Sequence, residues 1–229
     1  MKFKSQLITQ ASGSIGGVTA SRNKGGMYLR ARAIPVNPGS EFQTAVRGYL
    51  SQLTALWSNT LTDAQRLAWA NYAEHTPVVD SLGDSRVIPG LAMYVRSNVP
   101  RLQAGLARVD DGPTTFGLGD FTQPGITSIT ASTGVMIVTF EDTDEWLDET
   151  GSAMLVLTSR GQGPAINYFK GPFRYAGSIL GDDTTPLASP QNITIAFTVA
   201  ADQQVFSQFR VSRADGRLSA PLVLPKTSV

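Results

Sequence analysis

The 18 carboxylates are the main side chains of this sequence that could carry out catalysis, as a pair of acids does in glycoside hydrolysis, but nothing in the sequence selects a pair. His75 is its only histidine, and cysteine is absent from the 229 residues. Thiolate ligands and Cys nucleophiles are therefore excluded, and no arrangement of a Ser-His-Asp triad or a His-based metal site is indicated. His75 precedes Pro77 at the end of a predicted helix. We expect its side chain either to interact with the negative C-terminal end of that helix or to be a plain surface residue. We predict that the protein is not an enzyme and holds no cofactor or metal.

Acidic side chains cluster in the run EDTDEWLDET, residues 141–150, called the acidic segment below. Three interpretations are open: a solvated loop between strands, an ion site, or a surface on which a basic partner docks. A calcium loop could begin at Asp142, but the glycine and closing glutamate of EF-hand spacing are missing. The acidic segment surrounds Trp146 with Glu141, Asp142, Asp144, Glu145, Asp148 and Glu149.

Basic side chains gather near the other end of the sequence, in the glycine-rich run GSIGGVTASRNKGGMYLRARAIPVNP, residues 13–38. Residues 1–40 contain six basic and no acidic side chains, whereas the remainder contains 13 basic and 18 acidic ones. Opposite charges favour docking of the basic run on acidic surface, and the acidic segment is the candidate. Nucleic-acid contact is an alternative, since arginines bind phosphate and tyrosine stacks on bases. The candidate residues are Arg22, Lys24, Tyr28, Arg30 and Arg32.

Alternating apolar and polar residues predict a strand from Met27 to Ala33, with Arg30 and Arg32 on one face. Val18 and Ala20 begin a partner strand, so a hairpin with a basic face is expected. A lone hairpin is marginally stable in water, and glycine raises the entropy cost of ordering it. We predict that residues 1–38 form an extended arm that becomes ordered on a neighbouring subunit.

Helical periodicity dominates residues 39–106, the predicted helical domain. One helix is expected at 40–58, a second after the N-cap Thr62 with Gln65 at the capping-box position, and a third that ends near Pro100. A small β-hairpin is predicted between the second and third helices, around residues 82–84. The predicted core of this domain consists of Leu53, Trp57, Leu67, Trp69 and Tyr72.

Short β-branched segments begin at residue 124, after a predicted linker at 107–123. Seven or eight of them, separated by Gly, Pro, Asp and Ser, predict a β-sandwich over residues 124–229. A bulge near Ser207 is expected, to bring Val205, Phe209 and Val211 to one face. The run FRVSRADGRLSAP is similar to the last hairpin of fibronectin type III domains. The expected fold class is α+β: an arm, a helical domain and an immunoglobulin- or fibronectin III-like sandwich.

The segments before residue 107 resemble a group of phage and prophage proteins regarded as virion structural proteins. The resemblance rests on residues 13–38, on Gln43 and Arg47, and on the runs LTDAQRLAWANYA and GLAMYVRSN. It implies a non-enzymatic structural protein, associated with the capsid, neck or tail. Its partners would be copies of itself and other virion proteins. We expect no secretion signal and no membrane span, because no apolar run is long enough for either, so the expected location is the virion.

Two other functions fit the same residues. The chain could be a subunit of a non-viral extracellular filament, assembled by strand exchange through the arm. It could also be a module that binds or acts on carbohydrate, with an aromatic platform. The platform candidates are Trp146, Tyr168, Phe169, Phe173 and Tyr175.

Overall fold

The computed structural model describes residues 11–23, 26–79, 83–118 and 121–229. The chain divides into two compact units, a first unit of residues 1–41 and a second unit of residues 42–229. The predicted arm falls within the first unit, and the helices and the C-terminal strands share the second. Lys24, part of the predicted basic cluster, lies outside the described residues.

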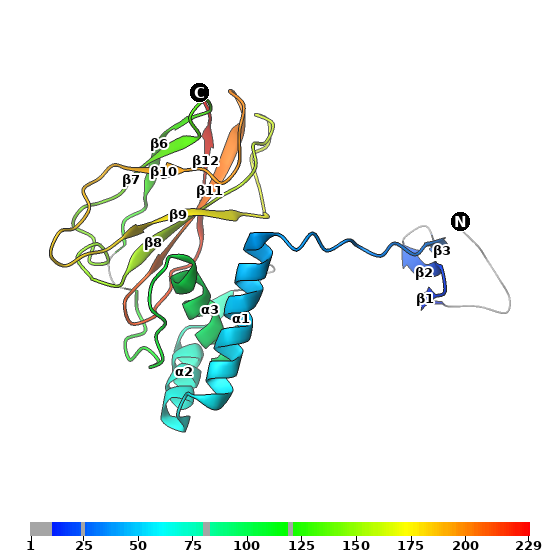
Figure 1. Cartoon of the computed structure of the whole chain (residues 1–229), viewed down its shortest axis with the longest axis horizontal. Helices are drawn as coiled ribbons and strands as arrows, with labels where there is room; N and C mark the ends of the chain where they lie inside the picture. Colours follow the sequence, from blue (N-terminus) through cyan, green and yellow to red (C-terminus); the bar gives the residue numbers. More distant parts are fainter. Residues whose placement is uncertain (1–10, 24–25, 80–82, 119–120) are drawn as a thin grey trace. The chain divides into compact units, whose positions relative to one another are not determined.

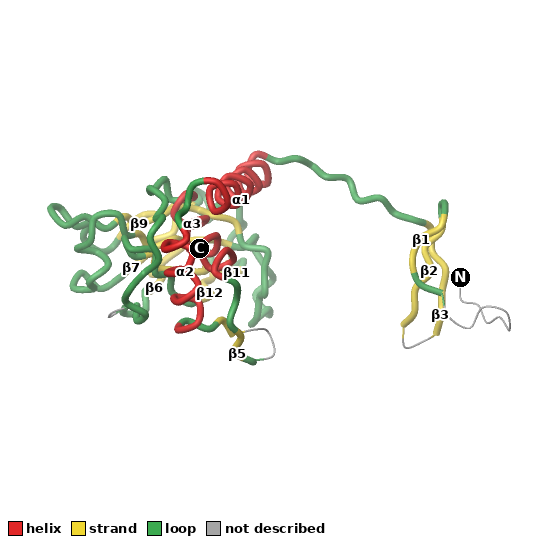
Figure 2. Tube along the Cα trace, turned by 90° about the horizontal axis from the view of Figure 1, so that it is seen from below, coloured by secondary structure: helices red, strands yellow, loops and turns green. Residues whose placement is uncertain are grey.

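The first unit contains a three-stranded antiparallel sheet, seen at the blue end of the chain (Figure 1) and as three yellow strands (Figure 2). The strands β1 (Gly13–Ile15), β2 (Val18–Asn23) and β3 (Gly26–Ala31) follow one another in the sheet. The predicted hairpin corresponds to β2 and β3. Strand β1 has no alternation to predict it, and Gly16, with φ +57°, makes its turn into β2.

The second unit begins with helices α1 (Glu41–Asn59), α2 (Asp63–His75) and α3 (Gly90–Gln103). The predicted capping box is confirmed at the start of α2. The backbone N–H of Gln65 donates to Thr62 Oγ1 at 3.3 Å, and that of Thr62 donates to Gln65 Oε1 at 2.9 Å. The predicted hairpin between α2 and α3 is the pair β4 (Val78–Val79) and β5 (Ser85–Arg86), and residues 80–82 of its turn lie outside the described residues.

The predicted end of the third helix near Pro100 is wrong, because α3 continues through that proline to Gln103. Proline removes one backbone donor and crowds the carbonyl four residues earlier, so the last turn of α3 depends on its tertiary contacts, in which Asn98 and Arg101 are buried. Gly105 terminates the helix instead, with φ +76°. The N–H of Leu106 donates to Arg101 O at 2.9 Å, which closes a Schellman motif.

The C-terminal half of the chain is mostly β structure, in two antiparallel sheets. The smaller sheet has the order β10-β7-β6, with β6 (Gly125–Thr130), β7 (Val135–Thr139) and β10 (Gln191–Thr194). The larger has the order β12-β11-β8-β9, with β8 (Ala153–Thr158), β9 (Arg174–Leu180), β11 (Gln204–Ser212) and β12 (Leu222–Thr227).

One apolar core lies between the two sheets, and both contribute strands to it. Val205, Phe209 and Val211 of β11 all point into this core, together with Ser207. The expected bulge near Ser207 is wrong, because β11 pairs with β8 and β12 without a register shift. All four residues have odd numbers, and strict alternation suffices to place them on one face. The other buried members are Ile129, Met136, Val138, Phe140, Trp146, Leu147, Met154, Val156, Ile179, Ile193 and Ile195.

A second core joins the three helices. Leu53, Trp69 and Tyr72 are buried in it as predicted, and Trp57 is partly buried against it. Leu67 is 70 % exposed, so its predicted place in the core is wrong. The helix face that Leu67 occupies is turned away from α3, which receives Trp69 instead.

The predicted linker carries hydrogen bonds that fix it to the helices. The Trp69 indole donates to Asp110 O at 2.9 Å, and the N–H of Val109 donates to Asn98 Oδ1 at 2.7 Å. Buried Arg101 of α3 donates to Ala107 O and, across the seam to the β region, to Arg213 O at 2.5 Å. The helices and the sheets are thereby held together within the second unit.

Candidate assembly surfaces

The three-stranded sheet of the first unit has one apolar and one polar face. Directly paired residues of antiparallel strands share a face, and neighbours along a strand alternate. The paired residues Ala20 and Leu29 therefore lie on one face of the sheet, and the paired residues Thr19 and Arg30 lie on the other. The apolar face carries Ile15, Val18, Ala20, Met27, Leu29 and Ala31, and the polar face Ser14, Thr19, Ser21, Tyr28 and Arg30.

Arg30 lies on the polar face, as the alternation along β3 predicts. Arg22 pairs with Met27, so it lies at the end of the apolar face, opposite to the side of Arg30. Arg32 follows β3, and its backbone N–H donates to Gly17 O at 2.9 Å. The described basic side chains therefore border both faces of the sheet.

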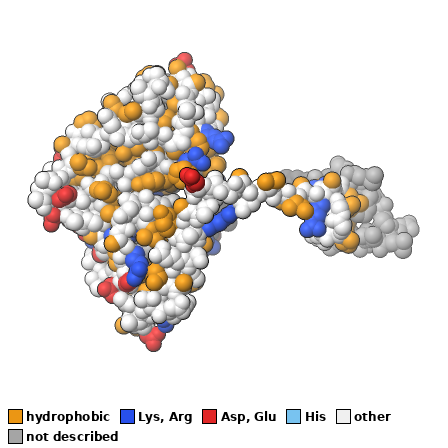
Figure 3. Space-filling view, viewed as in Figure 1, with side chains coloured by type: hydrophobic (Ala, Val, Ile, Leu, Met, Phe, Trp, Pro, Cys, Tyr) orange, Lys and Arg blue, Asp and Glu red, His pale blue; other side chains and the backbone are white. Residues whose placement is uncertain are grey.

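No described residue of the first unit is buried. Ile15 on the apolar face is 90 % exposed, and beyond the sheet Ile34 is 77 % and Val36 90 % exposed. In the view of Figure 3, apolar and basic side chains of this unit both reach the surface. Such a sheet, with apolar surface open to solvent, lacks a core of its own.

Several acidic side chains of the acidic segment form hydrogen bonds or ion pairs within the second unit. Asp144 is 3 % exposed, and its carboxylate accepts from the backbone N–H of Thr122 at 2.9 Å, from the Thr122 hydroxyl at 2.9 Å and from the Trp146 indole at 3.2 Å. Trp146 lies in the core between the sheets. Asp144 is therefore no surface for a partner, which corrects the docking prediction for this residue.

Glu145 and Glu149 both bind Arg213. The guanidinium lies 3.0 Å from Glu145 Oε2 and 2.5 Å from Glu149 Oε2, and it also donates to Leu118 O. Burial lowers the pKa of Arg213, but the two carboxylates outweigh burial and leave it raised. These acids hold the β11–β12 turn and the segment before β6 in place.

The remaining acids form an exposed rim. Asp142 accepts from the backbone N–H of Ser189, and Glu141 and Asp148 are exposed. The segment after β9 adjoins this rim, because Thr150 Oγ1 donates to Asp183 Oδ1 at 2.7 Å and Asp182 N donates to Leu147 O at 2.9 Å. Asp182 and Asp183 thus extend the acidic surface. Sequence spacing gave no sign of this, because strands β8 and β9 and the long loop between them separate the two segments.

Helix α1 exposes an apolar row that the helical pattern assigns to an inner face. Phe42, Val46 and Leu50 are 47 %, 38 % and 50 % exposed, and Leu53 is the buried residue of this helix. Arg47 and Asn59 belong to a shallow groove along the same helix. Successive residues of this row lie about one helical turn apart, which is the spacing of a helix face that packs on another element.

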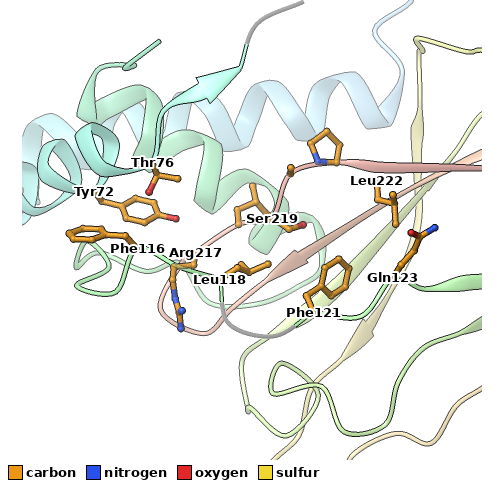
Figure 4. Close-up of a pocket in the computed structure, with 12 residues that line it drawn as sticks. Tyr72, Thr76, Phe116, Leu118, Phe121, Gln123, Arg217, Ser219 and Leu222 are labelled. Carbon is orange, nitrogen blue, oxygen red and sulfur yellow. The ribbon is translucent and has the colours of Figure 1, made fainter. Parts of the chain in front are cut away.

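A cleft of about 430 Å³ opens between α2 and the β11–β12 turn. Tyr72, Thr76 and Phe116 lie at one end and Phe121, Gln123 and Leu222 at the other, with Leu118, Arg217 and Ser219 between them (Figure 4). The cleft is therefore elongated and mostly apolar.

The aromatic end of the cleft is well packed. His75 stacks on Phe116 with ring centroids 4.3 Å apart, and Phe116 lies 6.4 Å from the ring of Tyr72. Burial raises the pKa of the Tyr72 phenol. The hydroxyl oxygen of Thr76 is buried and has no hydrogen-bond partner among the described residues.

The structure brings three of the five carbohydrate-platform candidates together, because Tyr168, Phe169 and Phe173 line one cavity. Phe169 lies 5.4 Å from the ring of Phe173 and 5.6 Å from that of Phe206, whereas Trp146 is fully buried in the core between the sheets. The cavity has a volume of about 350 Å³, and Tyr168 is 77 % exposed. Tyr175 lies in β9, and its hydroxyl is 3.0 Å from Ser178 Oγ.

Among the described residues, no group of three or more His, Asp and Glu side chains is arranged to hold a metal ion. Within the same part of the chain, no helix is both long and apolar enough to cross a membrane.

Comparison with known proteins gives no relative. The chain matches no protein family, no curated protein and no solved structure. The candidate surfaces therefore have to be interpreted from their own chemistry.

Proposed function

We propose that this chain is a non-enzymatic structural subunit of a phage-like particle, and that it assembles with its own copies through the sheet of the first unit. The observation that carries the proposal is the amphipathic sheet of β1, β2 and β3, whose described residues are all at least partly exposed. Isolated small sheets need a covered apolar face to be stable in water. A neighbouring subunit would provide that cover.

Charge favours contact between the first unit of one copy and the second unit of another. Residues 1–41 carry six basic and one acidic side chain, a net charge of +5, whereas residues 42–229 carry 13 basic and 17 acidic ones, a net charge of −4. Two first units repel each other, and a first unit attracts a second unit. Such head-to-tail contacts build closed rings or open filaments, the forms expected of capsid, neck and tail components.

The β region supports the structural role. Its chain passes from β6 and β7 in one sheet to β8 and β9 in the other, returns to β10, and ends with β11 and β12 in the second sheet. Crossing between two antiparallel sheets in this way is typical of immunoglobulin and fibronectin type III sandwiches. We propose a sandwich of that class, which the assembled particle would display.

Light scattering coupled to size exclusion, together with negative-stain microscopy, tests the assembly. We expect rings or filaments that grow with protein concentration. Leu29→Asp, on the apolar face, should shift the protein to monomers, whereas the matched change Leu67→Asp at an exposed site of α2 should leave assembly as in the wild type. A wild-type chain that stays monomeric at every concentration would overturn the proposal.

The same experiment separates the carbohydrate alternative from the two assembling ones. A particle subunit and an extracellular filament subunit would both assemble. A carbohydrate module would remain monomeric and bind glycans. Its case is weakened by the burial of Trp146, the largest member of the predicted platform.

A further inference from the structure

We propose that the cleft between α2 and the β11–β12 turn receives residues 34–36 of a neighbouring copy, with Ile34 and Val36 as its two anchors. This inference rests on the proposed function and names the acceptor surface for it. Ile34 and Val36 are 77 % and 90 % exposed, although both are β-branched and apolar. They belong to residues 32–40, which form neither helix nor strand.

The conformation of this segment suits an elongated groove. Pro35 fixes its own φ and favours an extended Ile34, and Pro38 does the same for Asn37. In an extended chain, side chains two residues apart point the same way and lie roughly 7 Å apart. Ile34 and Val36 can therefore enter one cleft side by side, and the prolines reduce the entropy lost when the segment is bound.

The cleft matches that segment in chemistry. Its walls are mainly the aromatic and aliphatic side chains of Tyr72, Phe116, Phe121 and Leu222. Grooves lined by aromatic residues are a recurring way of binding proline-containing extended segments. The hydroxyl groups of Thr76 and Tyr72 give this end of the cleft polar groups for the backbone of a bound chain. Its volume of about 430 Å³ is sufficient for two β-branched side chains.

Charge sets the direction of the bound segment. Arg30 and Arg32 precede Ile34 by four and two residues, so they would lie just outside the cleft. The wall residues Phe121 and Gln123 flank Thr122, which is bound to Asp144 of the acidic segment. The acidic segment therefore comes close to the end of the cleft at Phe121, and although Asp144 is itself buried, exposed acids of the same segment would attract the arginines of the incoming chain.

The absence of cysteine from the sequence allows a direct test by disulfide trapping. Two full-length chains with different mass tags, Val36→Cys and Thr76→Cys, are mixed and oxidised. A docked pair brings the two Cα atoms within the ~4.4–6.8 Å that a disulfide requires. We expect the mixed disulfide dimer to form at least roughly tenfold faster than for undocked pairs, because docking raises the effective concentration of the thiols.

Two matched pairs serve as controls. Val36→Cys with Thr54→Cys tests the exposed face of α1 as the alternative acceptor, and Val87→Cys with Thr76→Cys replaces Val36 by another exposed valine. Both should cross-link slowly. Ile34→Asp, added to the Val36→Cys chain, should abolish the fast reaction.

The outcomes separate this inference from the proposed function. Oligomers in light scattering without fast Val36–Thr76 trapping would overturn the cleft as acceptor and leave assembly standing. Faster trapping at Thr54 would assign the segment to α1 instead. A chain that carries both Val36→Cys and Thr76→Cys could instead form the disulfide within itself. If it does and the mixed pair does not cross-link, each chain fills its own cleft, and docking between copies is overturned. A wild-type chain without oligomers would overturn both proposals.

Discussion

The guanidinium group of Arg174 in β9 lies over the ring of Phe42 in α1, 4.5 Å from the ring centroid. The same guanidinium lies 4.7 Å from the ring centroid of Phe197. The first half of α1 is otherwise exposed, since its buried residue, Leu53, comes more than three turns later. Arg174 therefore fastens the start of α1 to the edge of the larger sheet.

Arg174→Gln should loosen the start of α1. A partly exposed cation–π contact is worth about 0.5–1 kcal/mol, so global stability should fall only slightly. Hydrogen exchange of the amides of residues 43–50 should rise clearly, because this contact limits local opening. Arg160→Gln is the control, since the Arg160 guanidinium lies 5.3 Å from the Phe197 ring and belongs to no contact with α1. Equal exchange in the two variants would contradict the fastening role.

Asp144→Ala should destabilise the second unit strongly. The change leaves the Thr122 amide and the Trp146 indole without their buried acceptor, at a cost of about 2–4 kcal/mol. Asp148→Ala removes the same charge at an exposed site of the acidic segment and should alter stability by less than about 0.5 kcal/mol. Urea unfolding followed by tryptophan fluorescence measures both. Similar losses would mean that the net charge of the segment matters, and not the hydrogen bonds of Asp144.

Local patterns in the sequence predict much of this fold. The capping box of Thr62 and Gln65 and the strict alternation along β11 are short-range signals, and both correspond to observed elements. Such short-range signals predicted neither strand β1 nor the continuation of α3 past Pro100. Glycine-rich strand β1 depends on pairing with β2, and the turn of α3 around Pro100 depends on the buried contacts of Asn98 and Arg101 with distant segments, which no local pattern contains.

The candidate surfaces were harder to predict, because burial depends on distant partners. Asp144 and Asp148 are both acids of one short run, yet one is buried by Thr122 and Trp146 and the other is exposed. Nothing within the run distinguishes them. Likewise, the cleft brings together Tyr72 and Leu222, which lie 150 residues apart and meet only once the helices dock on the β11–β12 turn.

Tyr94 makes stability depend on alkaline pH. Burial chiefly, and then the charge of Asp110, raise the pKa of Tyr94 to about 12, whereas an unfolded tyrosine ionises near pH ~10. The neutral phenol therefore stabilises the folded chain fully below pH ~10, and this contribution is lost as the pH rises towards 12. Urea midpoints measured between these values should fall less steeply for Tyr94→Phe than for the wild type. Tyr168→Phe, at an exposed site, should keep the wild-type slope. An unchanged slope in Tyr94→Phe would contradict the assignment.

Gly216 should not tolerate a side chain, because it packs the β11–β12 turn against the helices. Its φ is +93°, and an added Cβ would lie 3.1 Å from the ring of Trp69. The backbone strain and the displaced ring together should cost about 1–3 kcal/mol in Gly216→Ala. Gly163→Ala, where a Cβ meets nothing within 4 Å, should cost less than about 1 kcal/mol. Urea midpoints give both values, and the wavelength of tryptophan emission reports whether Trp69 shifts.

Because Arg217 and Leu218 of the same turn line the cleft, the Gly216 variant should also slow disulfide trapping between Val36 and Thr76, whereas the Gly163 variant should not. Equal midpoints for the two variants would show that the turn yields without disturbing Trp69.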